Sequence, residues 1–311
     1  MDNRLSIVIA FLNEKEEVEN TIESIRFWVG NRVDIVVVND CSDDNYPYDD
    51  RLKKFDIVYI VNSIRLGAAQ SKALGISKVR TEYFLLLDAH MRFYDADWLD
   101  VLISTLDKDD RRILCCQTKV LYKINNQVLE KPIVPCLGEK MGAYINFKED
   151  YHILEPEWNY FEKETDSSEE TISCLLGAAY CTSKRYWDYL KGYEGLMGFG
   201  LEEPYISLKT YLEGGKCVLL KKVIVGHIYR TKFPYRVNPQ YYEFNKIAIA
   251  YLLLPENIRN YVLSVCPDAL LIFKAQKEQL DRLKSYYHSI FSRDFEYYWT
   301  LNIEIVRKNK N

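Results

Sequence analysis

Four short runs of apolar, largely β-branched residues recur along the first 90 residues, and they constrain the fold more than any other feature of the sequence. The runs are residues 5–11, 34–39, 56–61 and 83–87. Between them, residues 13–28 and 68–78 have the spacing of amphipathic helices. Continuous apolar strands are typical of parallel sheets that are covered on both faces. We therefore predict an α/β fold with a mostly parallel central sheet flanked by helices.

Beyond about residue 120 the alternation of strands and helices becomes less regular. Helical spacing recurs at 177–190 and 203–213, and a strand pattern follows at 216–225. From about residue 240 to 311 the pattern is helical and amphipathic. We expect this last part to form a C-terminal helical extension.

The overall charge and the cysteine pattern exclude several classes of protein. The chain has 41 Lys and Arg against 45 Asp and Glu, a formal net charge of −4, whereas nucleic-acid binders are normally basic. The longest apolar stretch, 247–254, is too short to span a bilayer, and the N-terminus lacks the pattern of a signal peptide. The eight cysteines form no Cys-x-x-Cys pair, which favours reduced thiols. We expect a cytoplasmic protein that binds no nucleic acid.

Polar residues that follow the four strands are the first candidates for a functional site, because ligands of such sheets bind beyond the carboxyl ends of the strands. Asp88 and His90 follow the fourth strand, two residues apart, so both side chains can converge on one ligand. A carboxylate and an imidazole suit Mn²⁺, Zn²⁺ or Fe²⁺. Alternatively, Asp88 caps the next turn and His90 is an ordinary loop histidine.

Two later motifs add candidates of the same kind. His227 directly follows a strand in Val-Gly-His, where a lone histidine is more often a packed core residue. Glu202 and Glu203 follow a glycine-bearing loop at the start of a helix. Acidic residues also favour helix N-termini for electrostatic reasons alone, so this pair has a structural explanation too.

Taken in order, these motifs resemble those of a known family over roughly residues 5–230. Segments 6–14, 36–43, 62–75 and 87–90 (Leu-Asp-Ala-His) are similar to family 2 glycosyltransferases of the GT-A fold. Later segments resemble the polypeptide N-acetylgalactosaminyltransferases, which carry Trp-Gly-Gly-Glu-Asn and Val-Gly-His-Val runs. These later segments are 176–179, 192–194, 199–203, 214–215 and 225–228.

The resemblance implies an enzyme that moves a hexose or N-acetylhexosamine from a UDP-sugar to a hydroxyl acceptor. It implies Mn²⁺, or another divalent cation such as Mg²⁺, held by Asp88, His90 and His227. Such a cation stabilises the negative charge that develops on the leaving diphosphate. The nucleotide-binding residues would be Asn39, Asp40, Arg65 and Asp88, although Asn39 replaces the usual Asp.

The two related groups differ in stereochemistry at the Glu202-Glu203 pair. Family 2 enzymes generally invert and use an acidic residue at the second position as general base, whereas the N-acetylgalactosaminyltransferases retain and carry Asn there. Glu203 can accept a proton, so an inverting mechanism is favoured. Glu202 matches the glutamate that binds the donor sugar in both groups.

The resemblance also divides the chain. Residues 1–240 would form the GT-A domain, with a nucleotide-binding half at 1–120 and an acceptor-side half at 121–240, and 241–311 would form the helical extension. We expect residues 155–158 and the tail to recognise a glycan or lipid-linked acceptor during surface-glycan or lipid-linked oligosaccharide synthesis. The C-terminal helices would contact the inner face of a membrane or a second subunit.

Two other functions remain as alternatives to transfer. One is a non-catalytic module that binds nucleotide sugars or glycans, and the other is a metal-dependent hydrolase of sugar nucleotides. The first is disfavoured because the candidate site residues are all present. A dinucleotide oxidoreductase is disfavoured as well, because no Gly-x-Gly-x-x-Gly follows the first strand.

Overall fold

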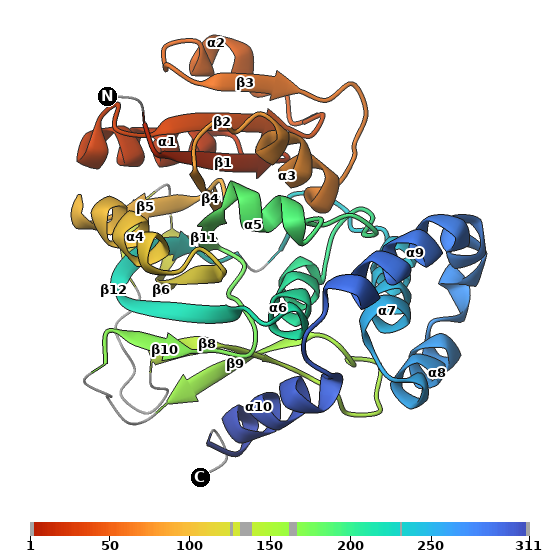
Figure 1. Cartoon of the computed structure of the whole chain (residues 1–311). Coiled ribbons are helices and arrows are strands. Elements are labelled where there is room, and N and C mark those ends of the chain that lie inside the picture. Colours follow the sequence, from red (N-terminus) through yellow and green to blue (C-terminus); the bar gives the residue numbers. More distant parts are fainter. Residues whose placement is uncertain (1–2, 125–126, 131–138, 162–166, 231, 309–311) are drawn as a thin grey trace.

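A central mixed sheet organises the chain in the computed structural model, which describes residues 3–124, 127–130, 139–161, 167–230 and 232–308 (Figure 1). In these residues the sheet has ten strands, eight of them in the order β10-β12-β6-β11-β4-β1-β2-β3, with β5 paired to β12 and β7 to β6. The strands are β1 (Leu5–Phe11), β2 (Asp34–Asn39), β3 (Val58–Val61), β4 (Tyr83–Leu87), β5 (Met91–Phe93), β6 (Arg112–Ile124), β7 (Gln127–Glu130), β10 (Glu169–Thr171), β11 (Ala179–Ser183) and β12 (Lys216–Ile228).

The centre of the sheet has two parallel parts joined by one antiparallel strand, and β5, β7 and β10 add antiparallel pairs to the second part. Strands β3, β2, β1 and β4 run parallel, and β6 runs parallel to β12. Strand β11 lies between these parts and is antiparallel to both β4 and β6. The predicted α/β architecture is confirmed, and the expected strands in the first 90 residues agree closely with β1 to β4.

Apolar residues that alternate along the strands supply the two faces of the sheet. Ile7 and Ile9 of β1 belong to one buried cluster with residues of α1 and α4, whereas Val8 belongs to a second cluster with residues of α3 and α6. Helices therefore cover both faces, as Figure 1 shows. These helices are α1 (Glu16–Val29), α2 (Tyr48–Leu52), α3 (Ala68–Ser77), α4 (Asp97–Lys108), α5 (Lys184–Tyr189) and α6 (Glu202–Glu213).

The C-terminal helices share the hydrophobic core of one face of the sheet. Phe244 and Ile247 of α7, Leu280 of α9 and Tyr298 of α10 are buried in the same cluster as Val8. The helices are α7 (Pro239–Leu253), α8 (Glu256–Val265), α9 (Leu270–Ile290) and α10 (Phe295–Lys308), and α10 also contacts a separate hairpin of β8 (Glu139–Ile145) and β9 (Pro156–Phe161). The tail is helical, as predicted, and it packs on the sheet domain.

One predicted element is wrong. The helix expected at 177–190 is the strand β11 followed by the short helix α5. Every residue of β11 is buried between β4 and β6, so sheet pairing overrides the local helical spacing. The helix begins only after Ser183, whose side chain accepts a hydrogen bond from the amide of Tyr186.

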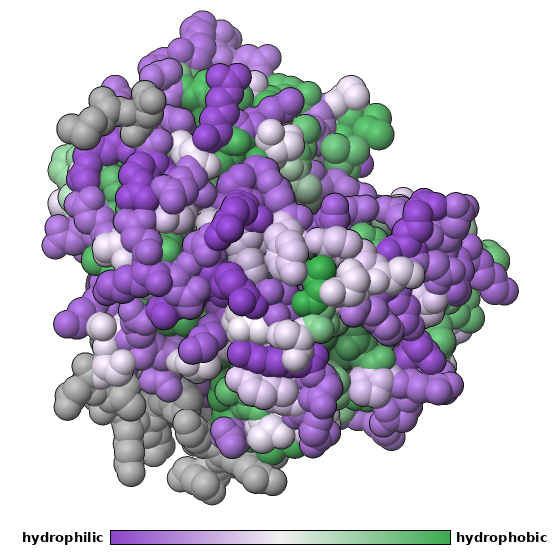
Figure 2. Space-filling model, in the orientation of Figure 1, coloured by the Kyte–Doolittle hydropathy of each residue, from purple (hydrophilic) through white to green (hydrophobic). Residues whose placement is uncertain are grey.

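The surface is mostly hydrophilic on the face seen in Figure 2, where hydrophobic residues form small separate patches. Among the described residues, the helices are all too short or too polar to cross a bilayer. In the same part of the chain, seven cysteines are free thiols and six of them are buried.

Truncating a core residue of α7 tests whether the C-terminal helices are integral to the domain. Ile247 is fully buried, so Ile247→Ala should lower the free energy of unfolding by about 2–5 kcal/mol. Leu271 on α9 is 78% exposed, and Leu271→Ala should change the free energy of unfolding by no more than about 0.5 kcal/mol. Urea denaturation would measure both. Unchanged unfolding of the sheet domain in Ile247→Ala would contradict a shared core.

Candidate active site

The carboxyl ends of β1, β2 and β4 lie side by side because these strands are parallel neighbours, and the loops that follow them carry most of the candidate residues. His90 precedes β5, which pairs with β12 so that Met91 lies opposite His227. This pairing brings the end of β12 to the end of β4. Residues more than 130 positions apart in sequence thereby meet at one edge of the sheet.

Asp88, His90 and His227 form a compact cluster whose ligand atoms all lie within 4.8 Å of one another. The Nε2 atoms of the two histidines are 3.1 Å apart, and His227 Nε2 is 3.4 Å from an oxygen of Asp88. Burial raises the pKa of Asp88, but hydrogen bonding to His227 and the charge of Lys72 outweigh burial, so the net pKa is lowered. The carboxylate is therefore ionised at neutral pH.

Glu14, which follows β1, contacts this cluster through His90. Its carboxylate lies 3.2 Å from His90 Nδ1 and forms a two-pronged ion pair with Arg230. Burial raises the pKa of Glu14, yet His90 and Arg230 lower it further than burial raises it. An ionised carboxylate only accepts hydrogen bonds, so Nδ1 of a neutral His90 carries the proton and Nε2 presents its lone pair to the cluster.

Asp40 holds the loop that follows β3. Its carboxylate accepts hydrogen bonds from the amides of Leu66 and Gly67 and from the side chain of Asn62, all at 2.8 Å. Asp40 is only 4% exposed. The neighbouring Asn39 is also buried, where it accepts from the amide of Ser42 and donates to the hydroxyl of Tyr59. Asn39 and Asp40, two of the four predicted nucleotide-binding residues, thus order the loops around the strand ends.

Arg65 lies on the outer side of the same loop. It is exposed and forms an ion pair with Asp43, which also accepts a hydrogen bond from Asn13. Asn13 has a positive φ of 60°, and its backbone amide is bound by Ser42. The side chain of Arg65 is therefore an accessible cation beside these loops.

Glu202 and Glu203 begin α6 and are enclosed by the domain. One oxygen of Glu202 accepts from the amide of Gly200, while Oε1 is buried and has no hydrogen-bond partner within the described residues. Burial raises the pKa of both carboxyls, to about 7 for Glu203. Lys72 of α3 lies 3.9 Å from Glu203 and opposes this rise.

Two glycines allow the glutamates to occupy this position. A Cβ atom on Gly177 would lie 2.9 Å from a carboxylate oxygen of Glu203. A Cβ on Gly67, whose φ is +88°, would lie 2.3 Å from the backbone of Gly198 in the loop that leads to Glu202. The second contact requires glycine and fixes the loop of Glu202 against α3, whereas a side chain at position 177 would displace the carboxylate of Glu203.

Aromatic side chains lie next to the histidine of β12. Tyr229 packs edge-on against His227 at 4.3 Å, and Trp158 of β9 lies 6.2 Å from Tyr229. Trp158, a predicted acceptor residue, is 38% exposed, and Tyr229 lies between it and His227 in this chain of ring contacts. Burial and the charges of Asp88 and Glu14 raise the pKa of Tyr235, which links it to the same region.

The structure brings together the three predicted metal ligands and encloses the two predicted glutamates nearby. Sequence reasoning missed Glu14, Lys72, Arg230 and Tyr235. Glu14 was within reach, since it lies just after the first strand, where functional residues are expected. Lys72 looks like a surface residue of a helix, and Arg230 and Tyr235 lie in an irregular segment without a motif.

Comparison with known proteins agrees with this geometry. Residues 6–156 match the family model described as Glycosyl transferase family 2. A crystal structure of GalNAc-T7 with UDP, GalNAc and Mn²⁺ has a TM-score of 0.79 at 18% identity and covers 97% of this chain and 57% of that one. The chain has the GT-A fold and a family 2-like sequence. The predicted resemblance is confirmed.

Two other solved structures share this GT-A fold. The structure of S. aureus TarS 1-349 in complex with UDP-GlcNAc has a TM-score of 0.53 at 13% identity and covers 88% of this chain and 73% of that one. The structure of mannosyltransferase PcManGT from Pyrobaculum calidifontis in complex with GDP-Man and Mn²⁺ has a TM-score of 0.50 at 12% identity. It covers 99% of this chain and 86% of that one.

Curated relatives are polypeptide N-acetylgalactosaminyltransferases. Polypeptide N-acetylgalactosaminyltransferase 6 from Bos taurus is 24% identical over 210 residues, which are 65% of this chain and 33% of the relative. Polypeptide N-acetylgalactosaminyltransferase 10 from Homo sapiens is 26% identical over 248 residues, which are 75% of this chain and 39% of the relative. This GT-A chain therefore spans well under half the length of these relatives.

Removing the Asp40 carboxylate should loosen the loop that it holds. Asp40→Ala leaves the amides of Leu66 and Gly67 without their acceptor, so their hydrogen exchange should accelerate at least about tenfold. Arg65→Ala serves as the control, because the Arg65 side chain pairs with Asp43 and leaves those amides bound. Equal exchange in Asp40→Ala and the wild type would rule out this role.

Proposed function

We propose that this protein is a metal-dependent glycosyltransferase that moves a hexose or N-acetylhexosamine from a UDP-sugar to a hydroxyl acceptor. The convergence of Asp88, His90 and His227 within 4.8 Å, beside two enclosed glutamates, carries the proposal. UDP and UDP-GlcNAc in structures of the same fold support the choice of donor. Surface-glycan or lipid-linked oligosaccharide synthesis is the pathway that we infer.

The three clustered side chains fit a divalent cation. They offer one carboxylate oxygen and two imidazole nitrogens, a mixed set that suits Mn²⁺. Separations of 3.1 and 3.4 Å are those of atoms that share one ion, and Glu14 orients His90 as metal-bound histidines require. When bound, the cation would neutralise charge on the diphosphate. Mn²⁺ in GalNAc-T7 and PcManGT structures supports this cofactor.

The remaining residues would bind and orient the donor. Arg65 is accessible at the loop after β3 and can pair with an anionic nucleotide, while Asp40 and Asn39 keep that loop and its neighbours ordered. The buried Oε1 of Glu202, which lacks a partner in the described residues, can accept a hydrogen bond from a sugar hydroxyl. Satisfying a buried carboxylate oxygen favours a ligand that donates there.

Glu203 is the general base in this proposal, and the outcome is inversion. A base works best when its pKa lies near the working pH, and burial raises the pKa of Glu203 to about 7. Lys72 limits that rise and keeps part of the carboxyl ionised. Glu203 would take the proton from the acceptor hydroxyl as that oxygen attacks the sugar. Trp158 and Tyr229 offer aromatic surface for the acceptor.

Replacing a metal ligand tests the cation site. His227→Ala should weaken Mn²⁺-dependent UDP binding at least about tenfold, because one of three ligands is lost. Isothermal titration with UDP, with and without Mn²⁺, measures this change. His152→Ala is the matched control, since His152 is exposed and pairs with Glu155. Wild-type affinity in His227→Ala would remove His227 from the site.

Replacing the base tests the chemical step and its pH dependence. Glu203→Gln should lower kcat by roughly 10²-fold or more with UDP affinity retained. In the wild type, kcat should fall as pH drops through about 7, because protonated Glu203 accepts no proton. Because Asp can also accept a proton, kcat of Glu203→Asp should show the same fall at low pH. Near-wild-type turnover of Glu203→Gln would exclude the role of base, and release of free sugar without acceptor would favour hydrolysis.

A further inference from the structure

A second cavity lies away from the residues of the candidate active site. It has a volume of about 690 Å³, which is in the usual range for ligand sites, and it opens between α3, α5 and α9. None of the predicted metal, nucleotide or catalytic residues lines it. The loop 191–197 forms one wall, and this loop leads on to Glu202. The active site therefore does not account for this cavity.

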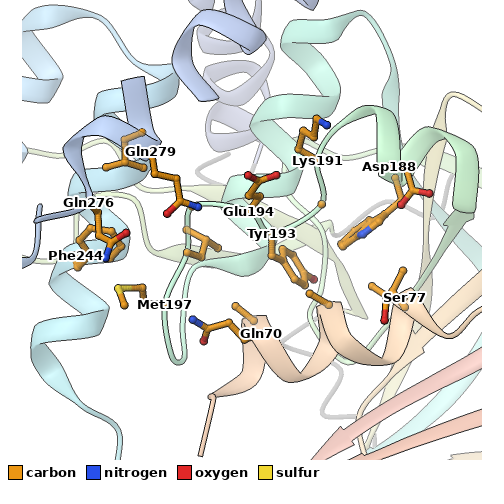
Figure 3. Close-up of a pocket in the computed structure, with 18 of the residues that line it drawn as sticks. Gln70, Ser77, Asp188, Lys191, Tyr193, Glu194, Met197, Phe244, Gln276 and Gln279 are labelled. Carbon is orange, nitrogen blue, oxygen red and sulfur yellow. The ribbon is translucent and has the colours of Figure 1, made fainter. Parts of the chain in front are cut away.

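Side-chain amides from two helices project into this space. Gln70 of α3 lies across the cavity from Gln276 and Gln279 of α9, as Figure 3 shows. Gln70 Oε1 accepts a hydrogen bond from the amide of Gly198. The side-chain amides of Gln276 and Gln279 have no hydrogen-bond partner among the residues that the structure describes. Each amide offers both a donor and an acceptor, which matches hydroxyl groups on a ligand.

The charges that line the cavity cancel. Two ammonium groups, Lys184 and Lys191, face two carboxylates, Asp188 and Glu194, so the formal sum is zero. Lys184 and Asp188 also neutralise each other directly as an ion pair. Such a wall has no excess charge to attract a phosphate or a carboxylate. The balance favours a neutral ligand.

Apolar groups complete the lining. Ala69, Ile76, Leu196 and Leu280 are buried beneath the polar side chains, together with Phe244. A ligand with hydroxyl groups at its edge and C–H groups on its faces satisfies both parts of such a surface. Sugar rings have this distribution of groups, whereas a nucleotide would bring uncompensated negative charge.

We propose that this cavity is a second carbohydrate site, which binds a short neutral oligosaccharide through Gln276, Gln279 and Gln70. The site is distinct from the metal cluster, and its occupation requires neither UDP nor Mn²⁺. Because its wall continues into the loop of Glu202, a bound glycan also contacts the segment that positions that glutamate. The proposal does not depend on the transferase activity.

The test measures binding of maltotriose, cellotriose, chitotriose and mannotriose to the full chain by saturation-transfer NMR and calorimetry. At least one should bind without UDP or Mn²⁺. Gln276→Leu combined with Gln279→Leu should weaken that binding at least about tenfold, since both free amides are lost. Ser77→Trp should block it by filling the cavity while leaving those amides in place.

Controls separate this site from the active site. Gln127→Leu, at an exposed position of β7, and Glu203→Gln should both leave oligosaccharide binding unchanged. UDP binding in the presence of Mn²⁺ should persist in all the cavity variants. Failure of all four oligosaccharides to bind, or binding that survives both cavity variants, would overturn the proposal. If the wild type does not bind UDP in the presence of Mn²⁺, only the proposed transferase function is overturned.

Discussion

The concentration of negative charge at one edge of the sheet is the constraint on which the rest of the site depends. Glu14, Asp88, Glu202 and Glu203 are buried or partly buried there. Ionised carboxylates are costly to bury unless cations or hydrogen bonds compensate them. Arg230 and the histidines compensate Glu14 and Asp88, whereas Lys72 lies 3.9 Å from Glu203 of the glutamate pair. A divalent cation between Asp88 and the histidines would complete this balance.

The sheet explains why this cluster forms at all. Parallel neighbours β1, β2 and β4 end at the same edge, and β5 then pairs with β12 to bring His227 to His90. Both helical layers hold this arrangement in place, and the C-terminal helices share the core of one layer. The loop before Glu202 is fixed by the close approach of Gly198 to Gly67. Distant segments are therefore all required to place a few side chains.

The sequence predicts those parts of the site that rest on local rules. Strand ends carry Asp88, His90, Asn39 and Asp40, and the strands themselves follow from continuous apolar runs. Tertiary contacts decide the rest. Residues 179–183 become a strand because β4 and β6 enclose them. Lys72 of α3 lies 3.9 Å from Glu203 of α6, although the two residues are 131 positions apart in the sequence. Arg230 pairs with Glu14 over 216 positions, which no local pattern encodes.

The central claim is that Asp88, His90 and His227 hold a divalent cation where the nucleotide diphosphate binds. Crystals grown with UDP and Mn²⁺, measured by anomalous diffraction at the manganese edge, test it most directly. We predict one strong anomalous peak within coordination distance of the Asp88 carboxylate and both Nε2 atoms, next to the diphosphate of UDP. Bound UDP with no manganese peak at these three side chains would contradict the claim.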